Sequence, residues 1–147
     1  MQSNVIIKCH CKNSKYLPFY ATKDSAGADI FADIDSDEIL KPGERKVITS
    51  GLKVEIPTGY EAQIRPRSGL ALKNGITILN TPGTIDSDYR GEIKVIMINL
   101  GTEDFIIKQG DRIAQMIIAP VTKAEFKLEL NLNNTERGEG GFGSTGF

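Results

Sequence analysis

The chain has 147 residues, of which 39% are hydrophobic and 25% charged, and its formal net charge is −1. This composition is typical of one globular domain and excludes a disordered chain, while the near-neutral charge argues against a protein that covers nucleic acid. No stretch approaches the roughly 18 consecutive apolar residues of a membrane span, and no signal-peptide pattern stands at the start. We therefore expect a cytoplasmic protein with neither a membrane nor a nucleic-acid partner.

The first predicted strand contains two cysteines, Cys9 and Cys11, with His10 between them. Side chains two residues apart on a strand share a face, which places the two thiols together but in poor geometry for a disulfide. A zinc site needs three or four protein ligands, and the sequence holds no other cysteine or histidine. We therefore favour ordinary thiols over a metal site.

Short segments of alternating polarity dominate the chain. Residues 52–57 (LKVEIP) alternate, and residues 124–132 (AEFKLELNL) alternate most clearly. Residues 92–100 (EIKVIMINL) are rich in strand formers, and their irregular alternation predicts burial on both faces. Turn signals such as Pro42-Gly43 space the strands by roughly 8–12 residues, as in sandwiches and barrels. The pattern predicts an all-β, jelly-roll-like barrel or sandwich.

Residues 68–74 (SGLALKN) are the exception, because their leucine and alanine content favours a helix. Ser68 suits the N-cap, and Gly75 suits the left-handed residue after the helix end. We predict one short helix there. Its start beside Arg67 presents backbone N–H groups, a hydroxyl and a guanidinium, a combination that fits phosphate binding as well as a plain helix start.

Four internal segments combine tight turns with carboxylate, hydroxyl, guanidinium and amide groups: DSAGADIFA (24–32), PRSGLALKNG (66–75), NTPGTIDSDYRGEI (80–93) and GDRIAQMI (110–117). Taken singly, most of these have a structural explanation as turns or hairpin tips. In the third segment, Asp86 supplies a carboxylate, a group that accepts a proton from a water held within hydrogen-bond reach. The alternative is that Asp86 and Asp88 cap the turn and face solvent. A fifth segment, RGEGGFGSTGF, has five glycines in eleven residues, which favours disorder in the free chain.

Taken together, these segments closely resemble the motifs of the trimeric dUTP pyrophosphatase (dUTPase) family, above all PRSGLALK, GTIDSDYRG, GDRIAQ and the RGEGGFGSTGF ending. The resemblance covers nearly the whole chain. It implies a jelly-roll homotrimer with shared active sites that hydrolyses dUTP to dUMP and pyrophosphate with Mg²⁺, limiting uracil in DNA and supplying dUMP for dTMP synthesis. Residues 1–136 would form the jelly-roll domain, and residues 137–147 a flexible, glycine-rich C-terminal arm that acts as a lid.

The resemblance also implies roles for individual residues. Asp86 would be the base that deprotonates the water attacking the α-phosphorus, and Asp29 would touch Mg²⁺ only through water, because the triphosphate supplies the direct ligands. Tyr89 would lie against the deoxyribose and exclude a ribose hydroxyl. Arg90 and Arg112 are expected to form structural or intersubunit ion pairs. The other substrate contacts would be Arg67, Ser68, Gly69 and Gln115 at the phosphates, Asn80, Gly83, Thr84, Ile85 and Lys94 around uracil, and Arg137, Phe142, Gly143, Ser144 and Thr145 in the arm.

Two other functions are weighed against this one. A dCTP deaminase-like relative would share the trimeric fold but needs a glutamate placed for deamination, whereas this hairpin carries Asp86 and Tyr89. A non-catalytic jelly-roll interaction protein would use the same scaffold to bind a partner. Such a role usually depends on extra loops, and this sequence has no obvious ones.

Overall fold

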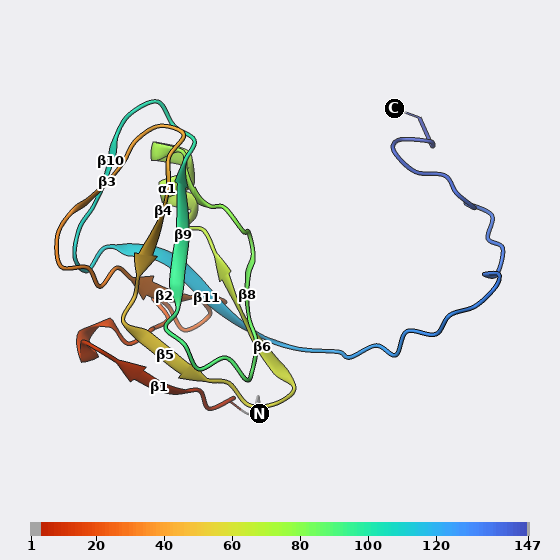
Figure 1. Ribbon diagram of the computed structural model, residues 1–147, viewed down its shortest axis with the longest axis horizontal. Coiled ribbons are helices and arrows are strands. Elements are labelled where there is room, and N and C mark those ends of the chain that lie inside the picture. The colour runs from red at the N-terminus through yellow and green to blue at the C-terminus, as the bar shows by residue number, and fades with distance from the viewer. Residues whose placement is uncertain (1–3, 147) are drawn as a thin grey trace.

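Short strands account for most of the regular structure in residues 4–146, the part of the chain that the computed structural model describes (Figure 1). One short α-helix, α1 (Ser68–Asn74), and one 3-10 turn, η1 (Ser14–Tyr16), accompany them. The strands are β1 (Lys8–Cys11), β2 (Ala28–Phe31), β3 (Glu38–Leu40), β4 (Arg45–Thr49), β5 (Leu52–Glu55), β6 (Tyr60–Arg65), β7 (Ile76–Ile78), β8 (Gly83–Ile85), β9 (Lys94–Asn99), β10 (Phe105–Ile107) and β11 (Arg112–Pro120). The prediction of an all-β fold with one short helix is confirmed.

The core lies between two antiparallel sheets, one with strand order β2-β11-β6-β8 and one with order β4-β9-β7. Two further strand pairs, β1-β5 and β10-β3, complete the fold. Both sheets contribute to a single buried cluster, which includes Ile30, Ile64, Ile113 and Met116 from the first sheet and Ile48, Ile76, Ile78, Val95 and Met97 from the second. Burial of this cluster provides the main driving force for folding.

Strand β9 is buried on one face only, which corrects the prediction of burial on both faces for residues 92–100. Val95 and Met97 point into the core, whereas Ile96 and Ile98 are half-buried on the opposite face. Both faces of the strand carry apolar side chains, but within a single copy of the chain only one face packs against the core. Strand β5 agrees with its prediction, with Leu52 and Val54 buried.

Helix α1 confirms the predicted helix and corrects its cap. Arg67, in extended conformation, is the N-cap residue and makes no side-chain cap bond, so Ser68 is already the first helical residue. No hydrogen bond of the Ser68 hydroxyl occurs within the described residues. At the other end, Gly75 has a φ of +67° and its N–H donates to the carbonyl of Ala71 over 3.1 Å, as predicted.

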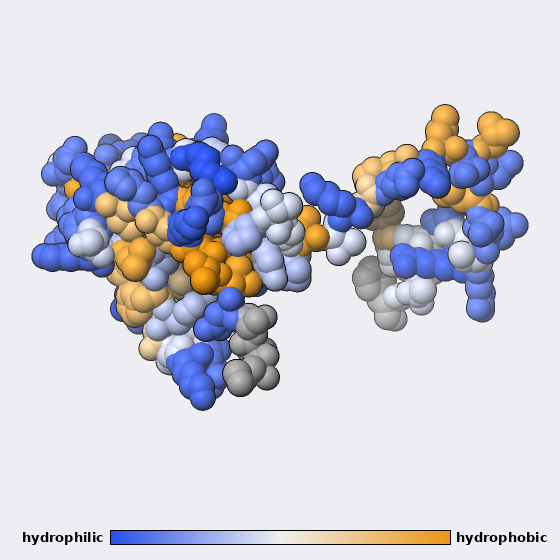
Figure 2. All heavy atoms as spheres, turned by 90° about the horizontal axis from the view of Figure 1, so that it is seen from below, coloured by the Kyte–Doolittle hydropathy of each residue, from blue (hydrophilic) through white to orange (hydrophobic). Residues whose placement is uncertain are grey.

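The chain after Pro120 leaves the body of the molecule in an extended path (Figure 1). The prediction of a strand over residues 124–132 is therefore wrong for the single chain, since a strand needs a partner and no described segment pairs with this one. Its apolar stripe is 86–101% exposed and consists of Phe126, Leu128, Leu130 and Leu132. Figure 2 shows hydrophobic residues on this detached segment, away from the body.

Strand β1 forms as predicted, with Cys9 exposed and Cys11 half-buried as free thiols. Loss of solvation from the atoms packed around them is the main cause that raises the pKa of both thiols, even though Cys9 keeps an exposed face. The Cys11 thiolate further raises the pKa of Cys9, and the Asp33 carboxylate further raises the pKa of Cys11. Both thiols are therefore poor nucleophiles near neutral pH. Within the described part of the chain, no helix is long and apolar enough to cross a membrane.

Candidate active site

One hollow, of about 310 Å³, opens where α1 begins and where β2 and β11 lie side by side. Its lining consists of Ala21, Ser25, Ala26, Gly27, Asp29, Arg67, Ser68, Gly69 and Gln115. The structure therefore brings Asp29 together with the four residues outside the arm that the sequence assigned to phosphate. We call this the phosphate hollow.

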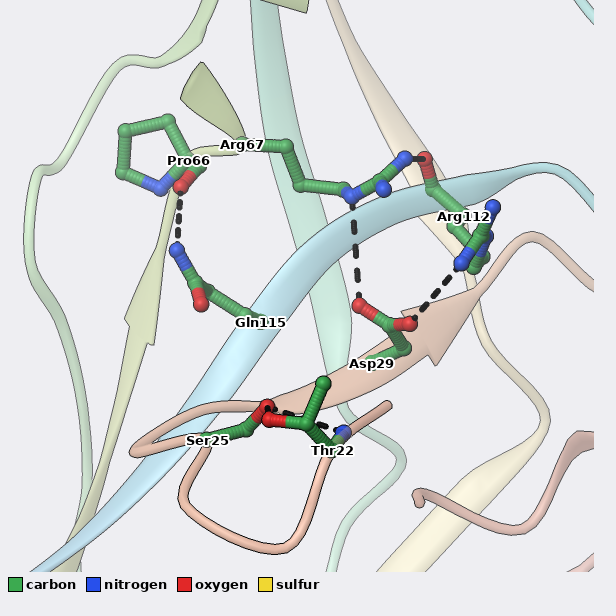
Figure 3. Close-up of polar contacts among 7 residues, drawn as sticks. All are labelled: Thr22, Ser25, Asp29, Pro66, Arg67, Arg112 and Gln115. Atoms are coloured by element: carbon green, nitrogen blue, oxygen red, sulfur yellow. Dashed lines mark hydrogen bonds and ion pairs between the residues drawn. The ribbon is translucent and has the colours of Figure 1, made fainter. Parts of the chain in front are cut away.

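The carboxylate of Asp29 lies between two arginines in this region (Figure 3). The Asp29 side chain is 10% exposed, with Arg112 Nη1 3.3 Å from its Oδ2 and Arg67 Nε 3.8 Å from its Oδ1. Arg67 Nη1 also donates to the carbonyl oxygen of Arg112 over 3.2 Å. Two cations thus compensate one nearly buried carboxylate, which makes its burial tolerable. Arg112 forms an ion pair, as expected, and forms it within its own chain.

Gln115 enters the phosphate hollow from β11, directly opposite Asp29 in the strand register. Its Nε2 donates to the carbonyl oxygen of Pro66 over 3.0 Å, which braces the turn into α1 (Figure 3). A Cβ atom at Gly27 would overlap the Gln115 amide. Glycine at position 27 is therefore what allows the amide to lie against the loop.

A second hollow, of about 250 Å³, lies in the hairpin that follows β8. It is lined by Thr84, Ile85, Asp86, Tyr89, Glu92, Ile93 and Lys94, and we call it the hairpin hollow. The Tyr89 N–H donates to the carbonyl of Asp86 over 3.1 Å and closes the turn. The predicted base thus shares this hollow with Tyr89 and with three of the residues predicted to surround uracil.

Several contacts fix the Tyr89 ring within the hairpin. Its hydroxyl donates to the carbonyl oxygen of Glu92 over 2.9 Å, and a Cβ atom at Gly91 would overlap the hydroxyl and the ring. Arg90 Nη1 donates to the carbonyl oxygens of Ser87 and Tyr89 over 2.7 and 3.1 Å. Arg90 therefore braces the turn, and its Nε lies 3.9 Å from Glu55 Oε1, so the predicted structural ion pair forms within the chain.

The two hollows lie toward opposite ends of β6 and share no lining residue. Strand β8 pairs with β6 so that Ile85 is opposite Ala62, which places Asp86 near the Tyr60 end. Arg67 follows the other end of the strand. Asp86 is therefore level with Glu61, and Arg67 lies six residues further along the extended chain, or about 20 Å away at 3.3 Å per residue. One copy of the chain therefore does not bring Asp86 to the phosphate hollow.

Other predicted site residues lie outside both hollows. Asn80 and Gly83 are neighbours at the start of β8, with the Asn80 amide 3.2 Å from the position of a Cβ on Gly83. In the arm, Arg137 Nε donates to the carbonyl of Gly140 over 2.8 Å, and Phe142 is fully exposed with a φ of +51°. The arm residues Gly143, Ser144 and Thr145 likewise line neither hollow. Residues 1–3 and Phe147, the last residue of the predicted arm, lie outside the described residues.

Some residues that line the two hollows were not predicted from the sequence. Ser25 and Gly27 fall in the segment 24–32 that the sequence singled out, yet their turn chemistry gave no separate role to either. Glu92 lines the hairpin hollow, and its backbone oxygen accepts the hydrogen bond of Tyr89, a contact that no side-chain pattern reveals. Arg112 lines neither hollow but contacts Asp29, and no signal in the sequence pointed to this contact, because an unbroken strand would place residues 112 and 115 on opposite faces.

Comparison with known proteins identifies the family. The dUTPase family profile matches residues 13–146. The deoxyuridine 5'-triphosphate nucleotidohydrolase of Treponema denticola is 61% identical over 136 residues, which cover 92% of this chain and 94% of that protein. That of Ehrlichia canis is 57% identical over 149 residues and covers 99% of this chain and 97% of the relative. This chain belongs to the dUTPase family.

Solved structures agree on the fold. A point mutant of the Staphylococcus bacteriophage 80alpha dUTPase, solved with dUpNHpp, superposes with a TM-score of 0.85 at 27% identity and covers 97% of this chain and 99% of that one. A mutant dUTPase from phage phi11 of S. aureus, which coordinates a structural Mg(II) ion, has a TM-score of 0.76 at 24% identity, covers 86% and 97%, and shows the fold alone. The jelly-roll prediction is confirmed.

Proposed function

We propose that this chain, a dUTP diphosphatase that hydrolyses dUTP to dUMP and pyrophosphate, uses Asp86 to activate the attacking water. The observation that carries the proposal is the position of Asp86 in the hairpin hollow beside Tyr89. A carboxylate is ionised at neutral pH and accepts a proton from a water held within hydrogen-bond reach. That water would attack the α-phosphorus, and pyrophosphate would leave from the opposite side.

The phosphate chain would lie in the phosphate hollow. The Arg67 guanidinium and the Ser68 hydroxyl, which does not cap the helix, both line this hollow. They would donate hydrogen bonds to the oxygens on which negative charge develops as the bond to pyrophosphate breaks. Gly69 and Gln115 would add a backbone N–H and an amide. This chemistry needs no covalent protein intermediate, because positioning and charge dispersal suffice for phosphoryl transfer.

The residues around Asp29 fit a magnesium ion that is held mainly by the substrate. Mg²⁺ prefers six oxygen ligands and keeps several waters. Within residues 4–146, no group of three or more His, Cys, Asp or Glu side chains is arranged to hold a metal ion. Asp29 provides one carboxylate at the phosphate hollow, which suits a contact with the magnesium ion through a bound water. When bound, the ion would neutralise charge on the phosphate oxygens.

The hairpin would recognise the nucleoside. Tyr89, held by its hydrogen bond to the Glu92 carbonyl and packed closely over Gly91, would lie against the deoxyribose. A ribose 2′-OH there would clash or lose its hydrogen bonds, which disfavours UTP. Uracil would be read by backbone and side-chain groups of Asn80, Gly83, Thr84, Ile85 and Lys94.

The separation of the two hollows supports a homotrimer with shared sites, as the family resemblance implies. A triphosphate held at Arg67 does not reach Asp86 of the same chain across about 20 Å of β6, so Asp86 would come from another copy. Apolar surface in the single chain supports association as well. Val47 is 58% exposed, and its neighbour in the sheet, Ile96, is only half-buried.

The arm, residues 137–147, would close over a site of the trimer as a lid on the jelly-roll domain of residues 1–136. Phe142 would stack on uracil, and Arg137 would bind the γ-phosphate. Gly143, Ser144 and Thr145 would add backbone and hydroxyl donors, since glycine lets the backbone approach phosphate closely. We place this reaction in the cytoplasm, in keeping with the sequence.

A product assay tests the proposal. The purified protein is incubated with dUTP, dCTP, dTTP or UTP and Mg²⁺, and pyrophosphate and ammonia are measured. We expect pyrophosphate from dUTP far in excess of that from the other three nucleotides. Ammonia from dCTP would indicate a deaminase instead, and the absence of any product would indicate a binding protein.

A further inference from the structure

A β-bulge in β11 determines which side chains surround Asp29. The register between β11 and β2 runs from Arg112 opposite Phe31 directly to Ala114 opposite Ile30, so Ile113 is the extra residue. Both Ile113 and Ala114 are buried in succession. Because a bulge restores the alternation one residue later, Arg112 and Gln115 lie on the same face of the strand although they are three residues apart.

The consequence is that Asp29 receives a partner on each side. Its Oδ2 faces Arg112 at 3.3 Å, and its Oδ1 faces Arg67 at the longer distance of 3.8 Å. Arg112 does not line the phosphate hollow, whereas Arg67 does. The two arginines are thus not equivalent: one is in position to turn toward a phosphate, and the other is in position to stay with the carboxylate.

We propose that Arg112 is a positioning residue that holds the Asp29 carboxylate when Arg67 turns from it to the triphosphate. The proposal rests on the proposed function, in which Arg67 binds phosphate and Asp29 contacts the waters of Mg²⁺. With Arg112 in place, Asp29 keeps a charge partner and a fixed orientation throughout. Without it, Asp29 would have Arg67 as its one remaining ion-pair partner among residues 4–146 and would compete with the phosphates for that guanidinium.

The test measures the link between magnesium and nucleotide affinity in the full-length protein. The dissociation constant of the non-hydrolysable analogue dUpNHpp is determined by calorimetry with EDTA and with saturating Mg²⁺, and the ratio of the two constants is compared between variants. We expect Arg112→Gln to reduce this ratio about tenfold, the effect typical of residues that orient a metal's surroundings. Affinity for dUMP, which lacks the β- and γ-phosphates, should change less than about twofold, within the usual effect of a surface substitution.

Matched variants separate this effect from general loss of charge or fold. Lys108→Gln removes an exposed cation from the loop that precedes β11, and no ion pair of its side chain occurs within the described residues, so the ratio should stay as in the wild type. Arg112→Lys keeps the charge without the planar fork and should give an intermediate ratio. In an Asp29→Asn background, Arg112→Gln should cause no further reduction, since the two residues act as one unit.

The possible outcomes distinguish the magnesium role of Asp29 from the positioning role of Arg112. A wild-type ratio of one would overturn the magnesium role of Asp29 and this inference with it. A normal wild-type ratio together with an unchanged ratio in Arg112→Gln, or equal losses of affinity with and without Mg²⁺, would overturn the role of Arg112 alone. If Arg112→Gln does not fold, an unchanged ratio in Arg112→Lys would have the same meaning.

Discussion

The two ends of β6 lie beside predicted site residues that are held in different ways. At the Arg65 end, charged side chains from β2, β11 and the N-cap of α1 hold one another, with Asp29 between Arg67 and Arg112. At the Tyr60 end, the hairpin is held by its own backbone, through the contacts of Tyr89 with Asp86 and Glu92. The first arrangement suits a ligand that brings its own charge, and the second suits a neutral base and sugar.

Under the proposed function, this difference explains why one chain would contain all of the catalytic groups without assembling a complete site. Each end is assembled independently of the other, and the rigid strand between them fixes their separation. Substitutions at the two ends should therefore have separable effects within a chain, and should complement each other between chains.

The largest effect is expected from Asp86→Asn at the hairpin end. Because the amide is a very poor proton acceptor, kcat should fall by about 10²–10⁴-fold, while the dissociation constant of dUpNHpp changes little. Steady-state kinetics and calorimetry measure the two quantities. Arg67→Gln at the other end should weaken dUpNHpp binding instead. Near-normal turnover in Asp86→Asn would remove this residue from the role of base.

Mixed oligomers test the separation of the two ends directly. Asp86→Asn and Arg67→Gln chains, each nearly inactive alone, are co-expressed with different tags, and the mixed species is purified on both. If each site takes its two ends from different copies, about a third of the sites in the doubly purified trimers regain both wild-type groups, because one of the three neighbour pairs in such a trimer has the productive order. Turnover should recover in proportion. Failure of the purified mixture to recover activity would mean that both groups act from one chain.

Deletion of residues 137–147 should affect both ends at once, because the arm is predicted to contact uracil and the γ-phosphate. The loss of stacking alone corresponds to about 1–3 kcal/mol, so we expect kcat/KM for dUTP to fall at least tenfold. The melting temperature should hardly change, since the arm is exposed and packs on no described part of the core. Full activity after truncation would remove the lid from the mechanism.

The smallest effect is expected from Gly91→Ala at the hairpin. The added methyl group overlaps the Tyr89 ring, so the ring must move away from the Glu92 carbonyl. We expect the preference for dUTP over UTP, measured as a ratio of kcat/KM values, to fall about tenfold. Tyr89→Phe keeps the ring and removes one hydrogen bond, and should lower the ratio less. Unchanged preference in both variants would argue against Tyr89 as the sugar discriminator.

Much of the fold was predictable because it depends on local rules. The helix over 68–74, its glycine at position 75 and the alternation over 52–57 follow from propensity, left-handed geometry and the two-residue period of a strand. The strand over 124–132 was predicted wrongly for the opposite reason. Alternation reveals that a segment has two different faces, and it does not reveal whether a partner strand exists in the same chain.

The candidate site was likewise predictable where local motifs determine it and unpredictable where long-range pairing does. Motif order pointed to Asp29, Arg67, Ser68 and Gln115 as a group, and the structure brings them together. The place of Arg112 depends on a bulge at Ile113, where two buried residues follow one another, and a sequence does not distinguish such a step from ordinary core composition. The separation of Asp86 from Arg67 depends on strand register, which is likewise a long-range property.

If the proposed trimer covers the exposed stripe of Phe126, Leu128, Leu130 and Leu132, the newly made chain depends on its own concentration. An uncovered, alternating apolar segment without proline is prone to pair with any available strand edge. By mass action, a plentiful supply of identical chains would then cover it, whereas scarcity would leave it exposed to proteases and to unrelated edges. Dilution would then lower the lifetime of the protein as well as its activity.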